Sequence, residues 1–250
     1  YIFCGGIYRI KGEIEKAMKK INTGLNILSI HIQTGVKPVV EFKIGKARAT
    51  AFSNLASIFY FKGDYKKAIE LYRKSLKILE ELDDKQSVGI TNGNLGLIYS
   101  DKGEYDKAIK LFYKHLKISE EIGDKRSVGI ASGNLGLLYE SIGEYNKAIE
   151  LFQKHLKIAR EIDDKRGLGT ASGNLGLVYK DKLEYDKAIG FLRKDLLTSE
   201  QIDDKYGIGI ASLNLGFVYL EKGNFKKAEK YLLKSFNIAQ EISDKFDMIY

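Results

Sequence analysis

The residues that could carry chemistry in this chain recur at equivalent places and do not gather at one place. Its three histidines are His31, His115 and His155, and the last two stand 40 residues apart. No grouping of histidine and cysteine has the spacing of a zinc site, and no glycine-rich phosphate loop follows a strand pattern. We therefore expect His115 and His155 to be packed side chains of a repeat, with no metal, no cofactor and no catalysis in this segment.

Paired aspartates could suggest acid catalysis, but their positions favour a structural role. Pairs occur at 83–84, 163–164 and 203–204, and Asp124 and Asp244 occupy the place of the second member. Each pair stands where a helix is predicted to begin. There, one carboxylate accepts a backbone N–H and the other interacts favourably with the helix dipole. These aspartates are predicted to be helix caps.

One block of 40 residues recurs along the chain. The string NLGLIYSDKGEYDKAIKLF begins at Asn94 and returns as NLGLLYESIGEYNKAIELF at Asn134. The same frame places asparagines at 54, 94, 134, 174 and 214. A fixed period in this range is typical of a solenoid, in which each unit buries its apolar face against its neighbours.

Each block is predicted to contain two helices and a tight turn. In one block the first helix covers about 125–141 and the second about 145–162, which makes an αα-hairpin. Glycines in mid-helix, where a partner helix can come close, are Gly96, Gly136, Gly176 and Gly216. Glycines at the turn, where a positive φ costs glycine little, are Gly63, Gly103, Gly143 and Gly223. Leu183 interrupts the second series, so we expect an altered or strained turn there.

The pattern N-L-G-x-x-Y…G-x-Y/F-x-K-A…F resembles the tetratricopeptide repeat, whose usual period is 34 residues. The longer period is similar to that of Pins-type adaptors, kinesin light chains and the sensor arms of some bacterial regulators. The resemblance implies an all-α, right-handed α-solenoid of helical hairpins that forms one domain over residues 1–250. Its expected units are a divergent cap at 1–43, then 44–83, 84–123, 124–163, 164–203 and 204–243, followed by the start of a further helix. Extra length near 33–43 is interpreted as a longer connection to the cap, with a functional loop as the alternative.

Composition limits the compartment and the partners. The chain has 250 residues, 44% of them hydrophobic, and no apolar run long enough for a membrane span. A single cysteine, Cys4, replaces a core leucine and predicts a reducing compartment such as the cytoplasm. Because the sequence starts without methionine and ends within what resembles another unit, we expect it to be a fragment of a longer protein or a trimmed one, with the missing part as the place for an effector.

The net charge of +8 could indicate a nucleic-acid partner. Basic residues form stripes on the second helices, namely Lys107, Lys110, Lys114 and Lys117, then Lys147, Lys154, Lys157 and Arg160. Acidic residues are interleaved with them, and no arginine–aromatic cluster that could stack bases is present. A solvated face is therefore favoured over a nucleic-acid surface.

The resemblance implies that first helices line the concave, ligand-facing side. The candidate peptide-binding residues there are Asn54, Asn94, Asn134, Asn174 and Asn214, because a carboxamide both donates to and accepts from a peptide backbone. One turn on lies an apolar floor of Ser57, Leu97, Leu137, Leu177 and Phe217, and the rim carries Lys46, Gln86, Arg126, Arg166 and Tyr206. The alternative is that the asparagines only join neighbouring units. A carboxylate clamp is not expected, since its basic positions hold Gly93, Gly133, Gly173 and Leu213.

Together these features predict a protein-interaction scaffold that binds a peptide segment of a partner in its concave groove. The first alternative is a sensor arm of a multidomain signalling protein. The second, less favoured, is a nucleic-acid-binding solenoid, which a steep dependence of binding on salt would reveal.

Overall fold

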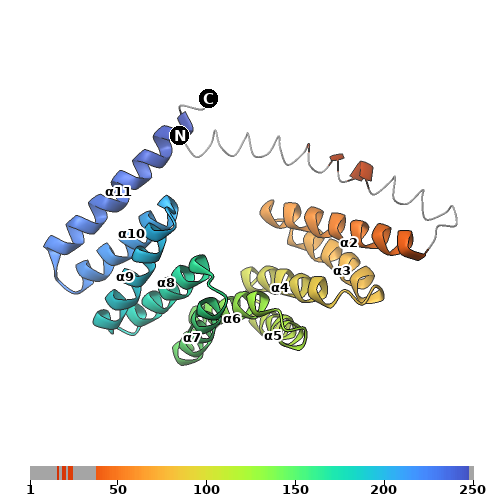
Figure 1. Cartoon of the computed structure of the whole chain (residues 1–250), viewed down its shortest axis with the longest axis horizontal. Coiled ribbons are helices and arrows are strands. Elements are labelled where there is room, and N and C mark those ends of the chain that lie inside the picture. Colours follow the sequence, from red (N-terminus) through yellow and green to blue (C-terminus); the bar gives the residue numbers. More distant parts are fainter. Residues whose placement is uncertain (1–15, 17–18, 21, 25–37, 248–250) are drawn as a thin grey trace. The chain divides into compact units, whose positions relative to one another are not determined.

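A computed structural model describes residues 16, 19–20, 22–24 and 38–247 (Figure 1). Helices and short turns make up the long range, and no strand occurs within the described residues. The predictions for Cys4, for His31 and for most of the divergent cap fall outside the described residues. The all-α fold class is confirmed.

The chain divides into two compact units, Tyr1–Ile122 and Gly123–Tyr250, which we describe separately. In the first unit, the helices are α2 (Pro38–Phe61), α3 (Tyr65–Glu81), α4 (Lys85–Asp101) and α5 (Tyr105–Glu121). In the second unit, they are α6 (Lys125–Ser141), α7 (Tyr145–Glu161), α8 (Lys165–Asp181), α9 (Tyr185–Gln201), α10 (Lys205–Glu221) and α11 (Phe225–Asp247). Consecutive helices pair as hairpins, and within each unit the hairpins pack on their neighbours (Figure 1). The single domain over 1–250 stays a prediction.

Aspartates cap the first helices as predicted. The Asp84 carboxylate accepts the backbone N–H of Ser87 at 3.1 Å, and Asp164 accepts that of Gly167 at 2.9 Å. Asp124 and Asp204 cap α6 and α10 in the same way. The cap fixes the first turn of each of these helices because it satisfies a donor that the helix leaves unpaired.

The turns between helices require a positive φ at one residue. Gly143 has φ of 79° in the α6–α7 turn, and the equivalent Leu183 has φ of 61° in the α8–α9 turn. A side chain at this backbone conformation is strained, since its Cβ crowds the following carbonyl. The predicted strained turn at Leu183 is confirmed.

Two helix boundaries differ from those that the sequence predicts. Helix α11 continues through Asp244, where we expected the cap of a further helix. Asp83, Gly123, Asp163 and Asp203 adopt positive φ in the corresponding turns, whereas this place holds Ser243, which tolerates that conformation less well. Helix α2, at Pro38–Phe61, also includes residues on the N-terminal side of the expected unit boundary at 44.

Close contact at the mid-helix glycines holds each hairpin together. In the α6–α7 hairpin, Phe152 is fully buried, and its ring lies 2.5 Å from where a Cβ on Gly136 would be. In the α8–α9 hairpin, Leu192 occupies the same place against Gly176, at 2.6 Å from such a Cβ. Real Cβ atoms do not tolerate such distances, so glycine allows the two helices to approach this closely. The predicted role of these glycines is confirmed.

Candidate binding groove

The five predicted asparagines all lie on first helices. Asn54 and Asn94 belong to α2 and α4 of the first unit, and Asn134, Asn174 and Asn214 belong to α6, α8 and α10 of the second. Asn54 is exposed and the other four are half-buried. Within the described residues, no hydrogen bond reaches any of these five side-chain amides. The alternative that they join neighbouring hairpins has no support in these contacts.

In the second unit, the amides open into two cavities that share one wall. A cavity of about 460 Å³ is lined by Asn134 and Asn174, with Leu137, Arg126 and Arg166 beside them. We call it the His155 cavity, because His155 also lines it.

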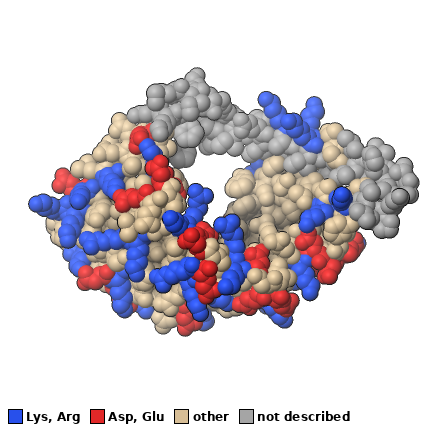
Figure 2. Space-filling model, in the orientation of Figure 1, with Lys and Arg blue, Asp and Glu red and all other residues tan. Residues whose placement is uncertain are grey.

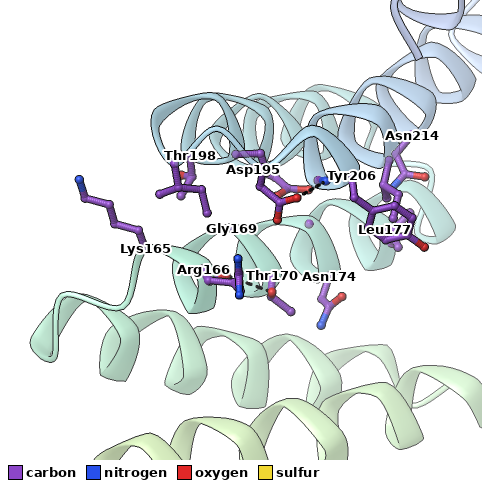
Figure 3. A pocket seen from close by; sticks show the side chains of 16 residues that line it. Lys165, Arg166, Gly169, Thr170, Asn174, Leu177, Asp195, Thr198, Tyr206 and Asn214 are labelled. Carbon is purple, nitrogen blue, oxygen red and sulfur yellow. Dashed lines mark hydrogen bonds between the residues drawn. The ribbon is translucent and has the colours of Figure 1, made fainter. Parts of the chain in front are cut away.

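The second cavity, of about 300 Å³, is lined by Asn174 and Asn214, together with Leu177, Arg166 and Asp195 (Figure 3). We call it the Asp195 cavity. The two cavities together form what we call the first-helix groove, which runs along α6, α8 and α10.

Four of the predicted residues lie elsewhere. In the first unit, Asn54 lines a separate cavity with Lys46 and Phe42. Asn94, Leu97 and Phe217 lie outside these three cavities. The structure thus brings together the candidates from α6 and α8 with Asn214, but not these four.

Two residues of the predicted apolar floor are exposed and three are half-buried. Leu137 is 45% exposed and Phe217 is 46% exposed, while Leu97 and Leu177 are half-buried. Ser57 is the only polar residue of this row, and its hydroxyl is hydrogen-bonded to the Tyr72 hydroxyl at 2.7 Å. Leu137 and Leu177 line the two cavities of the first-helix groove, so their apolar surface is accessible to a ligand there.

Two of the predicted rim residues pair with the cap of the following hairpin. Lys46 Nζ lies 2.8 Å from an Asp84 carboxylate oxygen, and Arg126 Nη2 lies 3.5 Å from one of Asp164. Arg166, which lines both cavities of the groove, forms no ion pair with any described residue. Its guanidinium is therefore free to bind a ligand.

One position on the second helices contributes to the groove although the sequence pattern predicted only packing there. It holds Ser75, His115, His155, Asp195 and Ser235. The prediction that the histidines are packed is confirmed, since His115 is buried against Gly93 and His155 is half-buried against Gly133. Two of these side chains, His155 and Asp195, also line the groove. The sequence feature that could have indicated this is a pair of glycines four residues apart on the facing helix. Residues four apart share one face of a helix, so that face carries no side chains there.

Burial changes the protonation of both groove residues. It lowers the pKa of His155, which therefore stays neutral at pH 7, although the charge of Asp164 opposes this shift. Burial raises the pKa of Asp195 to about 7, and the negative charge of Asp204 adds to the effect.

The charged second-helix stripe has the character of a solvated face. The predicted lysines on α5 are exposed, and acidic residues accompany them: Lys107 lies 2.5 Å from Glu104, and Lys114 lies 3.5 Å from Glu80. Figure 2 shows positive and negative side chains interspersed on the face in view. Within the described part of the chain, no group of three or more histidine, cysteine or acidic residues could hold a metal ion. No described helix is long and apolar enough to cross a membrane.

A family model described as tetratricopeptide repeat matches four overlapping segments, 47–121, 87–161, 127–196 and 167–241. The chain belongs to the tetratricopeptide-repeat family. This helical solenoid fold is typical of protein–protein interaction and is generally non-catalytic. A comparison with curated protein sequences gives no match.

Solved structures share the fold. BtubC from P. vanneervenii has a TM-score of 0.79 at 22% identity, with 92% of each chain covered. A Rap protein complexed with competence and sporulation factor has a TM-score of 0.66 at 16% identity, covering 88% of this chain and 59% of that one. A signal transduction ATPase with a tetratricopeptide repeat sensor from Pyrococcus horikoshii has a TM-score of 0.69 at 19% identity, covering 94% of this chain and 38% of that one. The closer likeness to Pins-type adaptors stays a prediction.

Proposed function

We propose that this repeat protein is a non-catalytic scaffold that binds a peptide segment of a partner protein along the first-helix groove. The observation that carries the proposal is the set of open amides in that groove. Asn134, Asn174 and Asn214 line its cavities, and no described residue hydrogen-bonds their side chains.

Half-buried polar groups of this kind favour a peptide ligand. A carboxamide that is partly removed from water and lacks a partner has unused donors and an acceptor. A peptide backbone offers the complementary groups at regular intervals. Successive asparagines from successive hairpins can therefore bond the backbone, while side chains of the peptide contact the apolar floor at Leu137 and Leu177.

The comparisons support binding of a partner in a fold of this kind. The similar Rap protein was crystallised in complex with competence and sporulation factor. At 16% sequence identity, this similarity shows only a shared fold. The choice of ligand class therefore rests on the groove itself. The cytoplasmic location, expected from the single cysteine, is part of the same proposal.

The test uses peptides selected from a displayed random library on the wild-type chain. Each backbone hydrogen bond contributes about 0.5–1.5 kcal/mol, so replacing Asn134 and Asn174 together should cost about 1–3 kcal/mol. Titration calorimetry should then show the dissociation constant raised about 5- to 140-fold, since a factor of ten corresponds to about 1.4 kcal/mol. The melting temperature should stay unchanged, because these amides bond no described residue.

A matched control removes two amides from second helices. Gln153 on α7 and Asn237 on α11 are exposed. Replacing both by alanine should leave peptide affinity unchanged. If the groove variant loses melting temperature and its affinity falls only in step with folding, the asparagines are structural and the proposal is wrong.

A second candidate is a sensor arm of a larger signalling protein. The similarity to an ATPase that carries a tetratricopeptide repeat sensor favours it. The two functions are compatible in the same groove, and they differ in whether occupancy changes the activity of a linked effector. Measuring effector activity in the full-length gene product, with and without a selected peptide, distinguishes them.

A further inference from the structure

One half-buried carboxylate faces the first-helix groove without a partner. Asp195 lines the Asp195 cavity from α9, and within the described residues it forms no hydrogen bond or ion pair. Its equivalent in α3, Ser75, is by contrast bonded to the Ala49 carbonyl oxygen at 2.8 Å and to the Ser53 hydroxyl. The carboxylate is therefore a feature of this hairpin and not of the repeat in general.

Two glycines of α8 allow the carboxylate to reach the groove. Asp195 Oδ1 lies 3.1 Å from where a Cβ on Gly169 would be, and Oδ2 lies 2.8 Å from one on Gly173. Any side chain at residue 173 would displace the carboxylate. The helix backbone is thus bare where Asp195 crosses it, and the acidic group becomes part of the cavity wall (Figure 3).

The other charged groups of this wall leave Asp195 uncompensated. Asp204 is engaged as the cap of α10, where it accepts the Gly207 N–H at 3.0 Å. Lys165 and Arg166 lie at the start of α8 and are exposed to solvent, and the Lys165 side chain extends away from Asp195 (Figure 3). When Asp195 is ionised, the inner part of the cavity is therefore negative, while the basic groups stand at its exposed edge.

The cavity has room for a side chain. Its volume of about 300 Å³ is roughly ten times the share of a water molecule in the liquid. Asn174 and Asn214 stand in its walls, at the places proposed above for the peptide backbone. A guanidinium group would present N–H donors in a planar fork that matches a carboxylate, and an ammonium group would supply a point charge.

We propose that the Asp195 cavity is a specificity subsite that accepts a cationic side chain, arginine or lysine, of the bound peptide, with Asp195 as its counter-ion. This inference rests on the function proposed for the groove and defines one position of the ligand. The neighbouring His155 cavity presents an imidazole in place of this carboxylate, and its one acidic group, Asp164, is paired with Arg126, so it offers no free counter-ion to a cation.

Protonation gives this subsite a signature that a purely structural aspartate lacks. Burial holds the pKa of Asp195 at about 7 in the free protein. A bound cation favours the charged carboxylate and lowers that pKa. A neutral ligand that accepts a hydrogen bond from the protonated form would raise it instead.

The experiment uses small probes, so that it does not depend on the identity of the partner. The whole chain, labelled with ¹⁵N, is titrated with butylguanidinium chloride and with its neutral analogue N-butylurea. We expect the amide signals of Gly169 and Gly173 to respond to butylguanidinium at a concentration at least tenfold lower than to butylurea. In Asp195→Asn this preference should disappear. Equal responses to both probes, or an undiminished preference in Asp195→Asn, would overturn the proposal.

A pH titration of the Gly173 amide shift supplies the second readout. Saturating butylguanidinium should move its midpoint to lower pH, whereas butylurea should not. A midpoint that stays in place or rises with butylguanidinium contradicts an ion pair.

Failure of the subsite and failure of the groove function are distinguishable. If selected peptides depend on Asn134 and Asn174 but not on Asp195, and butylguanidinium shows no preference, the subsite is wrong while the groove stands. If butylguanidinium binds at Asp195 but selected peptides ignore the asparagines, the cation subsite stands without the proposed groove.

Discussion

Replacing Gly136 by alanine distinguishes the effect of helix propensity on stability from the effect of side-chain packing. A Cβ at this position in α6 would lie 2.5, 2.7 and 2.9 Å from three carbons of the Phe152 ring, which is fully buried. Gly190 in α9 offers a matched control, since a Cβ there would meet nothing within 4 Å. Both glycines lie inside 17-residue helices of the second unit, so the change in helix propensity is comparable.

The two substitutions should change stability in opposite directions. Alanine is favoured over glycine inside a helix by about 0.8–1 kcal/mol, so Gly190→Ala should raise the free energy of unfolding by about 1 kcal/mol. Overpacking of a filled core costs about 1–3 kcal/mol, which offsets or exceeds that gain at residue 136. Gly136→Ala should therefore lower the free energy of unfolding by up to about 2 kcal/mol.

Urea denaturation followed by far-UV circular dichroism measures both variants against the wild type. The expected result is a higher midpoint for Gly190→Ala and a lower midpoint for Gly136→Ala, with similar slopes. If Gly136→Ala stabilises the protein as much as Gly190→Ala does, the close approach of α6 and α7 is not what requires glycine, and the account of the hairpin core is refuted.

Three further predictions concern a titrating group, a turn and the charged face. Because burial raises the pKa of Asp195 to about 7, the folded state holds its proton more tightly than the unfolded state, and this contribution to stability is lost as pH rises through 7. Asp195→Asn should therefore have a higher free energy of unfolding than the wild type at pH 8. This difference should shrink by up to about 3 kcal/mol towards pH 5, from two pH units at about 1.4 kcal/mol each. A difference that does not depend on pH contradicts the raised pKa. Leu183→Gly should raise the free energy of unfolding by about 1 kcal/mol, because it relieves a side chain held at a φ of 61°, and a lower denaturation midpoint would argue against strain there. Replacing four exposed lysines by glutamine should leave the melting temperature and peptide affinity nearly unchanged, since exposed ion pairs contribute about 0–1 kcal/mol each. If the variant no longer binds a nucleic acid that the wild type binds at physiological salt, a nucleic-acid surface is favoured instead. These lysines are Lys107, Lys110, Lys114 and Lys117.

Local signals made the helices predictable. The aspartate caps, the turn glycines and the apolar spacing all lie within one block, and they place α6 at Lys125–Ser141, as the sequence predicted. The strained turn at Leu183 was also predictable, because a single residue of each turn has the positive φ and leucine replaces glycine there. Where a boundary depended on a substitution inside the turn, as at Ser243, the repeat pattern alone was misleading.

The binding surface was only partly predictable. The asparagine row follows from the repeat, but a cavity depends on which helices lie opposite one another. Asp195 reaches the groove only because two glycines of the facing helix leave space for it, a relation between residues on different helices. Sequence spacing along α9 could not indicate that the carboxylate has no partner there.

Binding in the first-helix groove can be observed at the groove amides themselves. In ¹H–¹⁵N spectra of the whole chain, the side-chain NH₂ signals of Asn134 and Asn174 can be followed as a selected peptide is added. Both signals should move and saturate with the peptide, while the side-chain signals of the exposed Gln153 and Asn237 should stay in place. Groove signals that remain unchanged at saturation, with shifts confined to second-helix side chains, would contradict binding in the first-helix groove.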